Sequence, residues 1–149
     1  MTETTIHEFL TGFQLRRAVC QALLEQSRQQ SALIVADDYE QLLELLKAKQ
    51  ALLDHLGQLA RDQSPLRAAW FSSRAQMPSG ERARCDAVLA ETESLLAMLL
   101  TEEQSCSQRL TVRRDTTRRG LESLSVGVQA QHAYRPVEEV VSSRFDLNT

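Results

Sequence analysis

Apolar residues recur every three or four positions along most of the chain, which is the spacing of one face of an α-helix. Neither Gly nor Pro occurs between Gly12 and Gly57 or between Gly80 and Gly120, so two long stretches lack the usual helix breakers. The pattern predicts helices over residues 5–35, 38–61 and 80–128, a joint over 62–79 and a tail over 132–149. The predicted fold is all-α: an antiparallel helical hairpin or three-helix coiled-coil bundle over residues 1–131, with a long third helix and a flexible C-terminal tail.

The first predicted helix has an amphipathic face that Arg16 and Arg17 interrupt. Its members are spaced by three, four or seven residues: Ile6, Phe9, Phe13, Cys20, Leu24, Ser27, Ser31 and Ile34. We expect a boundary after it, because Asp37 or Asp38 can cap a new helix with Glu40 or Gln41 near the capping-box position. One helix continuing through this point stays an alternative, since no strong breaker lies there.

The second predicted helix has the clearest heptad pattern of the chain. Its seam steps by three and four residues through Tyr39, Leu42, Leu46, Lys49, Leu53, Leu56 and Ala60. A second row of leucines, at positions 45, 52 and 59, widens the apolar stripe enough to contact two other helices. We expect the Lys49 ammonium to reach outward to solvent while its aliphatic stem packs in the seam.

The joint is expected to close one end of the hairpin with its bulky residues Trp70, Phe71 and Met77, and Ser79 to cap the third helix. The seam of that helix runs through Cys85, Val88, Thr92, Leu95, Leu99, Glu102 and Cys106. After Arg113 and Arg114 the pattern resumes, in a row that comprises Leu110, Thr117, Leu121, Leu124 and Val128.

Composition narrows the functional classes. The chain has 149 residues with only 5 Gly, 3 Pro and 5% aromatics, which argues against β-sandwiches, barrels and Gly-loop nucleotide folds. A net charge of −3 is not typical of a general nucleic-acid binder. Three widely spaced cysteines without a CxxC motif favour a reducing compartment. The polar N-terminus lacks a signal-peptide pattern and no apolar run approaches the ~20 residues of a membrane span, so we expect a cytoplasmic protein without membrane insertion.

Residues that carry catalysis or bind metals are dispersed. His7, His55 and His132 fall in three different predicted elements, and none has a second His or Cys three or four positions away. Adjacent acidic residues such as Glu102 and Glu103 point about 100° apart on a helix and do not form a carboxylate pair over one substrate. No phosphate-loop, dinucleotide-binding or nucleophile-elbow motif occurs. The sequence therefore predicts a protein that is not an enzyme and has no metal or cofactor.

One segment concentrates positive charge. Arg109–Arg119 holds five Arg and one Asp and therefore has a local charge of +4. Because the whole chain has a net charge of −3, the remaining residues have a net charge of −7. The segment is either a solvated helix face or a surface for phosphates or an acidic partner. No aromatic residues are interleaved with it, which disfavours binding of single-stranded nucleic acid.

The C-terminal region invites two interpretations. Apolar residues follow Pro136 in the tail, and the tail is a frayed terminus, folds back on the bundle or orders on a partner. The preceding Leu121, Leu124 and Val128 have the i, i+3, i+7 spacing of anchors that bind a helix or a groove.

The segment from Leu33 to Leu56 resembles the FlgN-type flagellar export chaperones. Its acidic turn, Asp37-Asp38-Tyr39, precedes a leucine-rich helix in which Lys49 stands before the pair Leu52-Leu53. The resemblance is close over this segment and extends elsewhere only to the layout of three helices and a short tail.

This resemblance implies a cytoplasmic, ATP-independent chaperone of the flagellar type III secretion system. Such proteins bind the C-terminal helices of hook–filament junction (hook-associated) proteins, prevent their premature assembly and deliver them to the export gate. The family places the cargo surface on the last helix and the residues after it. Here that corresponds to Leu121, Leu124, Val128, Val137, Val140 and Phe145, with Tyr134 as a candidate contact for the export gate.

Three other functions stay open at this point. They are a chaperone for another secreted flagellar protein, a structural coiled-coil protein that oligomerises, and an acidic-ligand or nucleic-acid binder that uses Arg109–Arg119.

Overall fold

The computed structural model describes residues 2–134, and all their regular structure is helical. The elements are α1 (Glu3–Val35), α2 (Tyr39–Asp62), α3 (Ser64–Ser73), the 3-10 turn η1 (Arg74–Gln76) and α4 (Ser79–Tyr134). The all-α prediction with a long last helix is confirmed. The predicted joint contains α3 and η1, and Ser79 is the first residue of α4 rather than its cap. The chain divides into two units, Met1–Ser107 and Gln108–Thr149, and α4 contributes to both.

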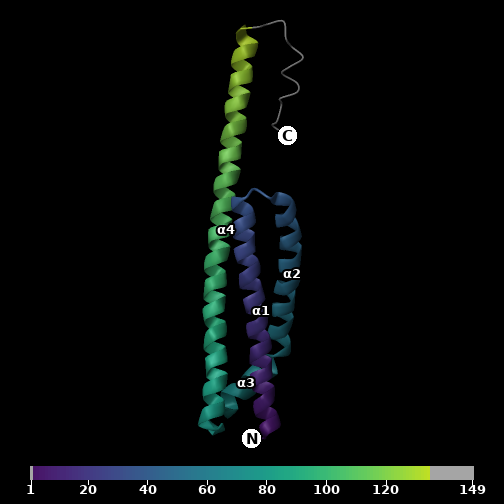
Figure 1. Cartoon of the computed structure of the whole chain (residues 1–149), viewed down its shortest axis with the longest axis vertical. Helices are drawn as coiled ribbons and strands as arrows, with labels where there is room; N and C mark the ends of the chain where they lie inside the picture. The colour runs from purple at the N-terminus through teal and green to yellow at the C-terminus, as the bar shows by residue number, and fades with distance from the viewer. Residues whose placement is uncertain (1, 135–149) are drawn as a thin grey trace. The chain divides into compact units, whose positions relative to one another are not determined.

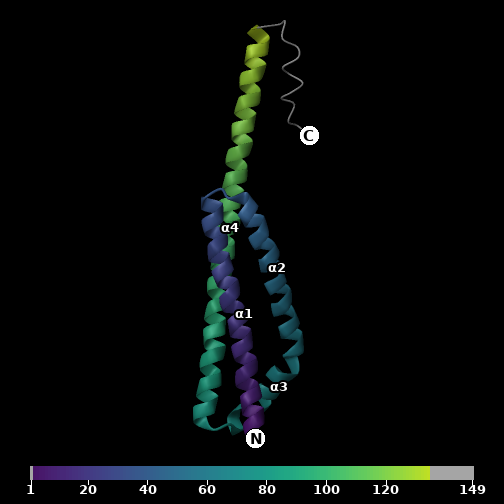
Figure 2. The ribbon, with the colours of Figure 1, turned by 45° about the vertical axis from the view of Figure 1, so that its right-hand side comes forward.

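In the first unit the three long helices run up, down and up, side by side in both views (Figures 1 and 2). Three hydrogen bonds join α1 to α4 at sequence separations of 74, 76 and 75 residues: Arg17 with Glu91, Ser27 with Glu103 and Ser31 with Cys106. Because the separation stays nearly constant along the helices, α1 and α4 are parallel. Helices α1 and α2 run in opposite directions, because Lys49 of α2 donates to Gln30 of α1, whereas Gln63, the residue directly after α2, donates to the Gly12 carbonyl of α1. These two helices therefore form the predicted antiparallel hairpin.

The reversal between α1 and α2 takes three residues, Ala36 to Asp38. Asp37 has a positive φ of 57°, and the backbone N–H groups of Asp37 and Asp38 donate to the carbonyls of Ile34 and Leu33 at 3.2 and 3.1 Å. This is the Schellman arrangement that ends a helix by satisfying its last carbonyls. Asp38 then caps α2, because its side chain accepts the Gln41 N–H at 3.2 Å. The predicted boundary and its acidic cap are confirmed.

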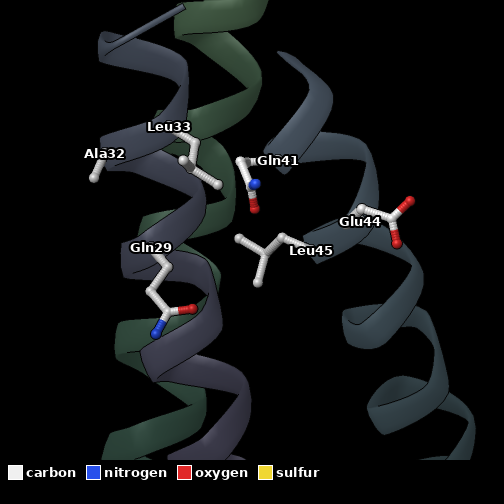
Figure 3. Close-up of a pocket in the computed structure, with 6 residues that line it drawn as sticks. All are labelled: Gln29, Ala32, Leu33, Gln41, Glu44 and Leu45. Atoms are coloured by element: carbon white, nitrogen blue, oxygen red, sulfur yellow. The ribbon is translucent and has the colours of Figure 1, made fainter. Parts of the chain in front are cut away.

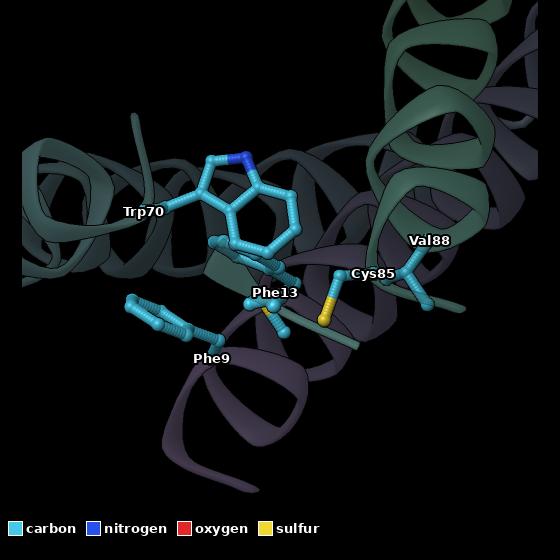
Figure 4. Close-up of a cluster of buried hydrophobic side chains, with 6 residues drawn as sticks. Phe9, Phe13, Trp70, Cys85 and Val88 are labelled. Carbon is cyan, nitrogen blue, oxygen red and sulfur yellow. The ribbon is translucent and has the colours of Figure 1, made fainter. Parts of the chain in front are cut away.

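An aromatic cluster closes one end of the first unit, where α3 crosses the long helices (Figure 4). The Trp70 ring meets the rings of Phe9 and Phe13 edge to face, with ring centroids 5.5 and 5.4 Å away. Met77, Cys85 and Val88 complete the buried set. The expectation for Trp70 and Met77 is confirmed, whereas that for Phe71 is wrong: its side chain is 75% exposed. Neighbouring residues of a helix point about 100° apart, so α3 can bury only one of the two rings.

Farther along the first unit, a second cluster joins all three long helices. It contains Val19 and Leu23 from α1, Leu59 from α2 and Leu99 from α4, with partly buried leucines at 52, 56 and 96 around it. The buried or half-buried seam of α2 therefore combines members of both predicted rows: 42, 45, 49, 52, 56 and 59. Tyr39, Leu46 and Leu53, which were predicted on the seam, are exposed.

In the second unit, residues 108–134 form the C-terminal part of α4. The helix continues through Gly120 and Gly127. None of the residues 108–127, whose exposure the structure describes, is buried. Beyond Tyr134, the predicted tail sites Val137, Val140 and Phe145 lie outside the described residues.

Candidate functional site

Three of the predicted partner-binding residues, Leu121, Leu124 and Val128, continue a row of the last helix that begins at Leu110 and Thr117. At about 100° per residue, Leu110, Thr117, Leu121, Leu124 and Val128 fall within about 60° of arc. We call these five residues the apolar strip. Leu121 is 43% exposed and Leu124 is 65% exposed. The side chain of Val128 lies outside the described part of the structure, as does that of Tyr134, the last residue of α4. The structure therefore places Leu121 and Leu124, both exposed, on one face of the helix.

The opposite face of the same segment offers an internal comparison. Val112 and Val126 are 63% and 65% exposed, but they lie about 180° and 140° around the helix from Leu121. They have no leucine at i+3 or i+4, so they are isolated exposed residues of the kind common on any protein surface.

Arginines of the Arg109–Arg119 segment border the apolar strip. Arg114 and Arg118 lie about 20° and 60° from Leu121 on one side, and Arg113 lies about 80° away on the other. The Nε atom of Arg114 lies 3.7 Å from Asp115 Oδ1, and the two side chains are 67% and 44% exposed. Such surface pairs contribute little stability, so Arg114 can exchange this contact for a stronger partner.

A different exposed apolar surface lies on α2 of the first unit, and the sequence pattern did not separate it from the buried seam. Tyr39, Leu43, Leu46 and Leu53 are all exposed, and they repeat at intervals of three, four and seven residues. On the α1 side of α2 there is an open groove of about 410 Å³, lined by Gln29, Ala32, Leu33, Gln41, Glu44 and Leu45. Figure 3 shows Leu33 and Leu45 directed into the space between the two helices.

A polar cluster lies where the three long helices of the first unit meet. Lys49 is only 4% exposed. Its Nζ donates to Gln30 Oε1 at 2.8 Å and to the Glu103 carboxylate, which also accepts the Ser27 hydroxyl at 2.7 Å. The expectation that Lys49 extends to solvent is therefore wrong, because α1 and α4 supply acceptors inside the bundle.

The electrostatics of this cluster follow from its contacts. Burial raises the pKa of Glu103, but the hydrogen bonds from Lys49 and Ser27, together with the Lys49 charge, outweigh it and hold that pKa below its ordinary value. Sliding α2 by one helical turn would leave Lys49 buried without its acceptors, so the cluster favours a single register of the three helices.

The described residues contain no group of three or more His, Cys, Asp and Glu side chains arranged to hold a metal ion. Cys20, Cys85 and Cys106 are free thiols, each buried in the first unit. Burial is the main cause that raises the pKa of Cys20 and of Cys85, which disfavours the reactive thiolate. Within residues 2–134, no helix has the combination of length and apolar character that crossing a bilayer demands.

Comparison of the chain with models of known protein families, with curated proteins and with solved structures finds no match.

Proposed function

We propose that this protein is a cytoplasmic, ATP-independent chaperone of the FlgN type. It binds the C-terminal helices of flagellar hook–filament junction proteins, keeps them from assembling prematurely and delivers them to the export gate. The observation that carries the proposal is the apolar strip: Leu121 and Leu124 are exposed on a regular helix with the i, i+3 spacing of helix-binding anchors. The resemblance of residues 33–56 supplies the class of cargo.

The division of the chain supports this assignment. The first unit has its own two apolar clusters, which contain no residue beyond Leu99. Substitutions in the apolar strip therefore leave that core intact. A partner helix packed on the strip would remove the exposed leucine surface from water, at about 25 cal/mol for each Å² of apolar area buried.

The test compares two double variants of the full chain. Leu121→Asp with Leu124→Asp places two charges in the apolar strip, and Val112→Asp with Val126→Asp places two charges on the opposite face. Each variant is mixed with purified hook–filament junction proteins, and complex formation is measured by co-purification and calorimetry. We expect the first pair to abolish binding, the second pair to retain it, and both to keep the wild-type helical circular dichroism.

Two results would contradict the assignment. Cargo that still co-purifies with the Leu121→Asp, Leu124→Asp variant would place the binding surface elsewhere. Failure of the wild-type chain to bind any junction protein would remove the proposed class of cargo. Truncation after Ala130 provides a separate test of the C-terminal residues, since we expect it to preserve the fold and to reduce delivery of cargo for export.

A structural protein that oligomerises is a second candidate function, and the exposed residues of α2 favour it. Leu43, Leu46 and Leu53 repeat with the spacing of a helix-pairing seam. The molar mass measured by light scattering distinguishes the two candidates. A wild-type dimer that becomes a monomer in the Leu43→Glu, Leu53→Glu variant supports self-association through α2. A wild-type monomer at ~100 μM, well above the range of ordinary specific association, rules it out.

A further inference from the structure

Three arginines of the Arg109–Arg119 segment border the apolar strip, and the proposed function does not use them. Arg114 and Arg118 are exposed and follow the same edge of the strip, one turn apart. Arg113 borders the other edge, whereas Arg119 lies about 160° from Leu121.

The acidic residues of this segment lie away from the strip. Asp115 and Glu122 are about 120° and 100° from Leu121, on the flank beyond Arg118. A helix placed on Leu121 and Leu124 therefore meets arginine side chains at its borders before it meets any carboxylate of the segment. The rest of the chain carries −7, so this face differs in sign from the protein as a whole.

We infer that this face selects an amphipathic helix with acidic residues along the borders of its apolar side. The inference rests on the proposed function for the location of the site, and it adds the charge of the partner. The partner's apolar residues cover Leu121 and Leu124, while its carboxylates accept hydrogen bonds from the guanidinium groups of Arg114 and Arg118. Arginine suits this role because its planar donors match a carboxylate and its long stem covers apolar surface.

Nucleic acid fits the same face less well. Phosphates would pair with Arg114 and Arg118. The sugar-phosphate backbone is polar, however, so it would not cover the exposed side chains of Leu121 and Leu124. No aromatic side chain lies in residues 108–127 on which a base could stack. The joint presence of leucines and arginines on one face is what an acidic amphipathic helix matches.

The experiment uses two synthetic helical peptides of about 18 residues, five helical turns, as defined probes. They share the same leucines at i, i+3 and i+7 and differ only at the flanking positions, which carry Glu in one and Lys in the other. Binding to the full chain is measured by fluorescence anisotropy at ~50 and ~300 mM salt. We expect the Glu peptide to bind about tenfold more tightly at the lower salt, with a smaller ratio at the higher salt because exposed charges are screened.

Charge-reversal variants locate the effect. Arg114→Glu with Arg118→Glu should invert the preference so that the Lys peptide binds more tightly. Arg119→Glu is the matched control on the opposite face, and it should leave the Glu peptide preferred. Circular dichroism of each variant verifies that α4 keeps its helicity.

The outcomes separate this inference from the function it rests on. The two peptides could bind equally, with binding lost in the Leu121→Asp, Leu124→Asp variant. That result would overturn the charge selection and leave the apolar site in place. Binding of neither peptide counts against both. Tighter binding of duplex DNA than of the Glu peptide, lost in the Arg114→Glu, Arg118→Glu variant, would assign the face to phosphates and overturn the inference.

Discussion

Replacement of Lys49 by Met tests whether the buried polar cluster holds the three helices of the first unit together. Met has nearly the length of the lysine stem and fills the same space, so the change removes the ammonium without creating a large cavity. In the native cluster that ammonium donates to Gln30 Oε1 at 2.8 Å and to the Glu103 carboxylate. The variant removes this donor from Gln30 Oε1, whereas Glu103 keeps the hydrogen bond from the Ser27 hydroxyl.

The expected cost follows from the exposure of each acceptor. Gln30 is buried, and an unsatisfied buried acceptor costs about 1–3 kcal/mol. The Glu103 side chain is 38% exposed, so water replaces the lost donor and its share is about 0–1 kcal/mol. We therefore expect Lys49→Met to lower the free energy of unfolding by about 2 kcal/mol. With a urea m-value of about 2 kcal/mol per M, the midpoint falls by about 1 M.

Urea unfolding followed by circular dichroism measures this change, with Lys47→Met as the matched control. Lys47 is exposed and pairs with Glu44 at 3.3 Å on the surface, so its replacement should shift stability by less than about 0.5 kcal/mol. Adding Gln30→Leu to Lys49→Met removes the orphaned acceptor and should restore part of the loss. If Lys49→Met and Lys47→Met unfold at the same urea concentration, the reasoning about a buried donor is refuted.

The lowered pKa of Glu103 makes the same cluster depend on pH. Because the folded-state pKa lies below the ordinary value, ionised Glu103 stabilises the fold above the ordinary glutamate pKa of about 4.3, and this contribution disappears as the pH falls through the folded-state value. The difference in unfolding free energy between the wild type and Glu103→Gln should therefore be largest near pH 7 and shrink toward pH 3. A difference that grows on acidification would contradict the assigned direction.

Substitutions at four further positions test the fold by the same urea assay. Trp70→Ala should destabilise the first unit by about 3–5 kcal/mol, because the ring fills the aromatic cluster. Phe71→Ala should change stability by less than about 0.5 kcal/mol, because that ring is exposed. Equal effects would mean that the wrong ring has been placed in the core. Asp37→Val should cost about 1–2 kcal/mol because a β-branched residue resists the positive φ, and Asp37→Gly should not, so a loss in both would point to the side chain instead. Gly57→Ala should raise stability by about 0.5–1 kcal/mol, since the added methyl group meets only Arg61 Nη1, at 3.8 Å, and a decrease would reveal a steric conflict.

Much of the candidate site was predictable, because it depends on spacing within one helix. The positions of Leu121 and Leu124 on a common face follow from the sequence once the segment is helical. The leucines lie after Gly120 and the arginines before it. The two sets flank one another only because α4 continues through Gly120, which helix propensity alone disfavours. Their exposure required the tertiary structure, since the same pattern describes helices with a covered face.

The sequence by itself determined the three long helices and most of the α1 and α4 seams, whereas α3 lay within the predicted joint. The absence of Gly and Pro defined the long elements, and the three-four repeat selected residues such as Phe13, Cys85 and Thr92, all of which are buried. This information is local: helical periodicity depends only on the chain's own neighbours at i+3 and i+4.

Only the tertiary structure decided which members of the two apolar rows of α2 face its neighbours, which ring of the joint enters the core, and where the Lys49 ammonium lies. The physical reason is that burial is a property of pairs of helices. An isolated helical pattern directs a lysine to water, but acceptors from α1 and α4 converge on Lys49 and stabilise it inside the bundle. Those acceptors lie 19 and 54 residues away in the chain, beyond the reach of any local pattern.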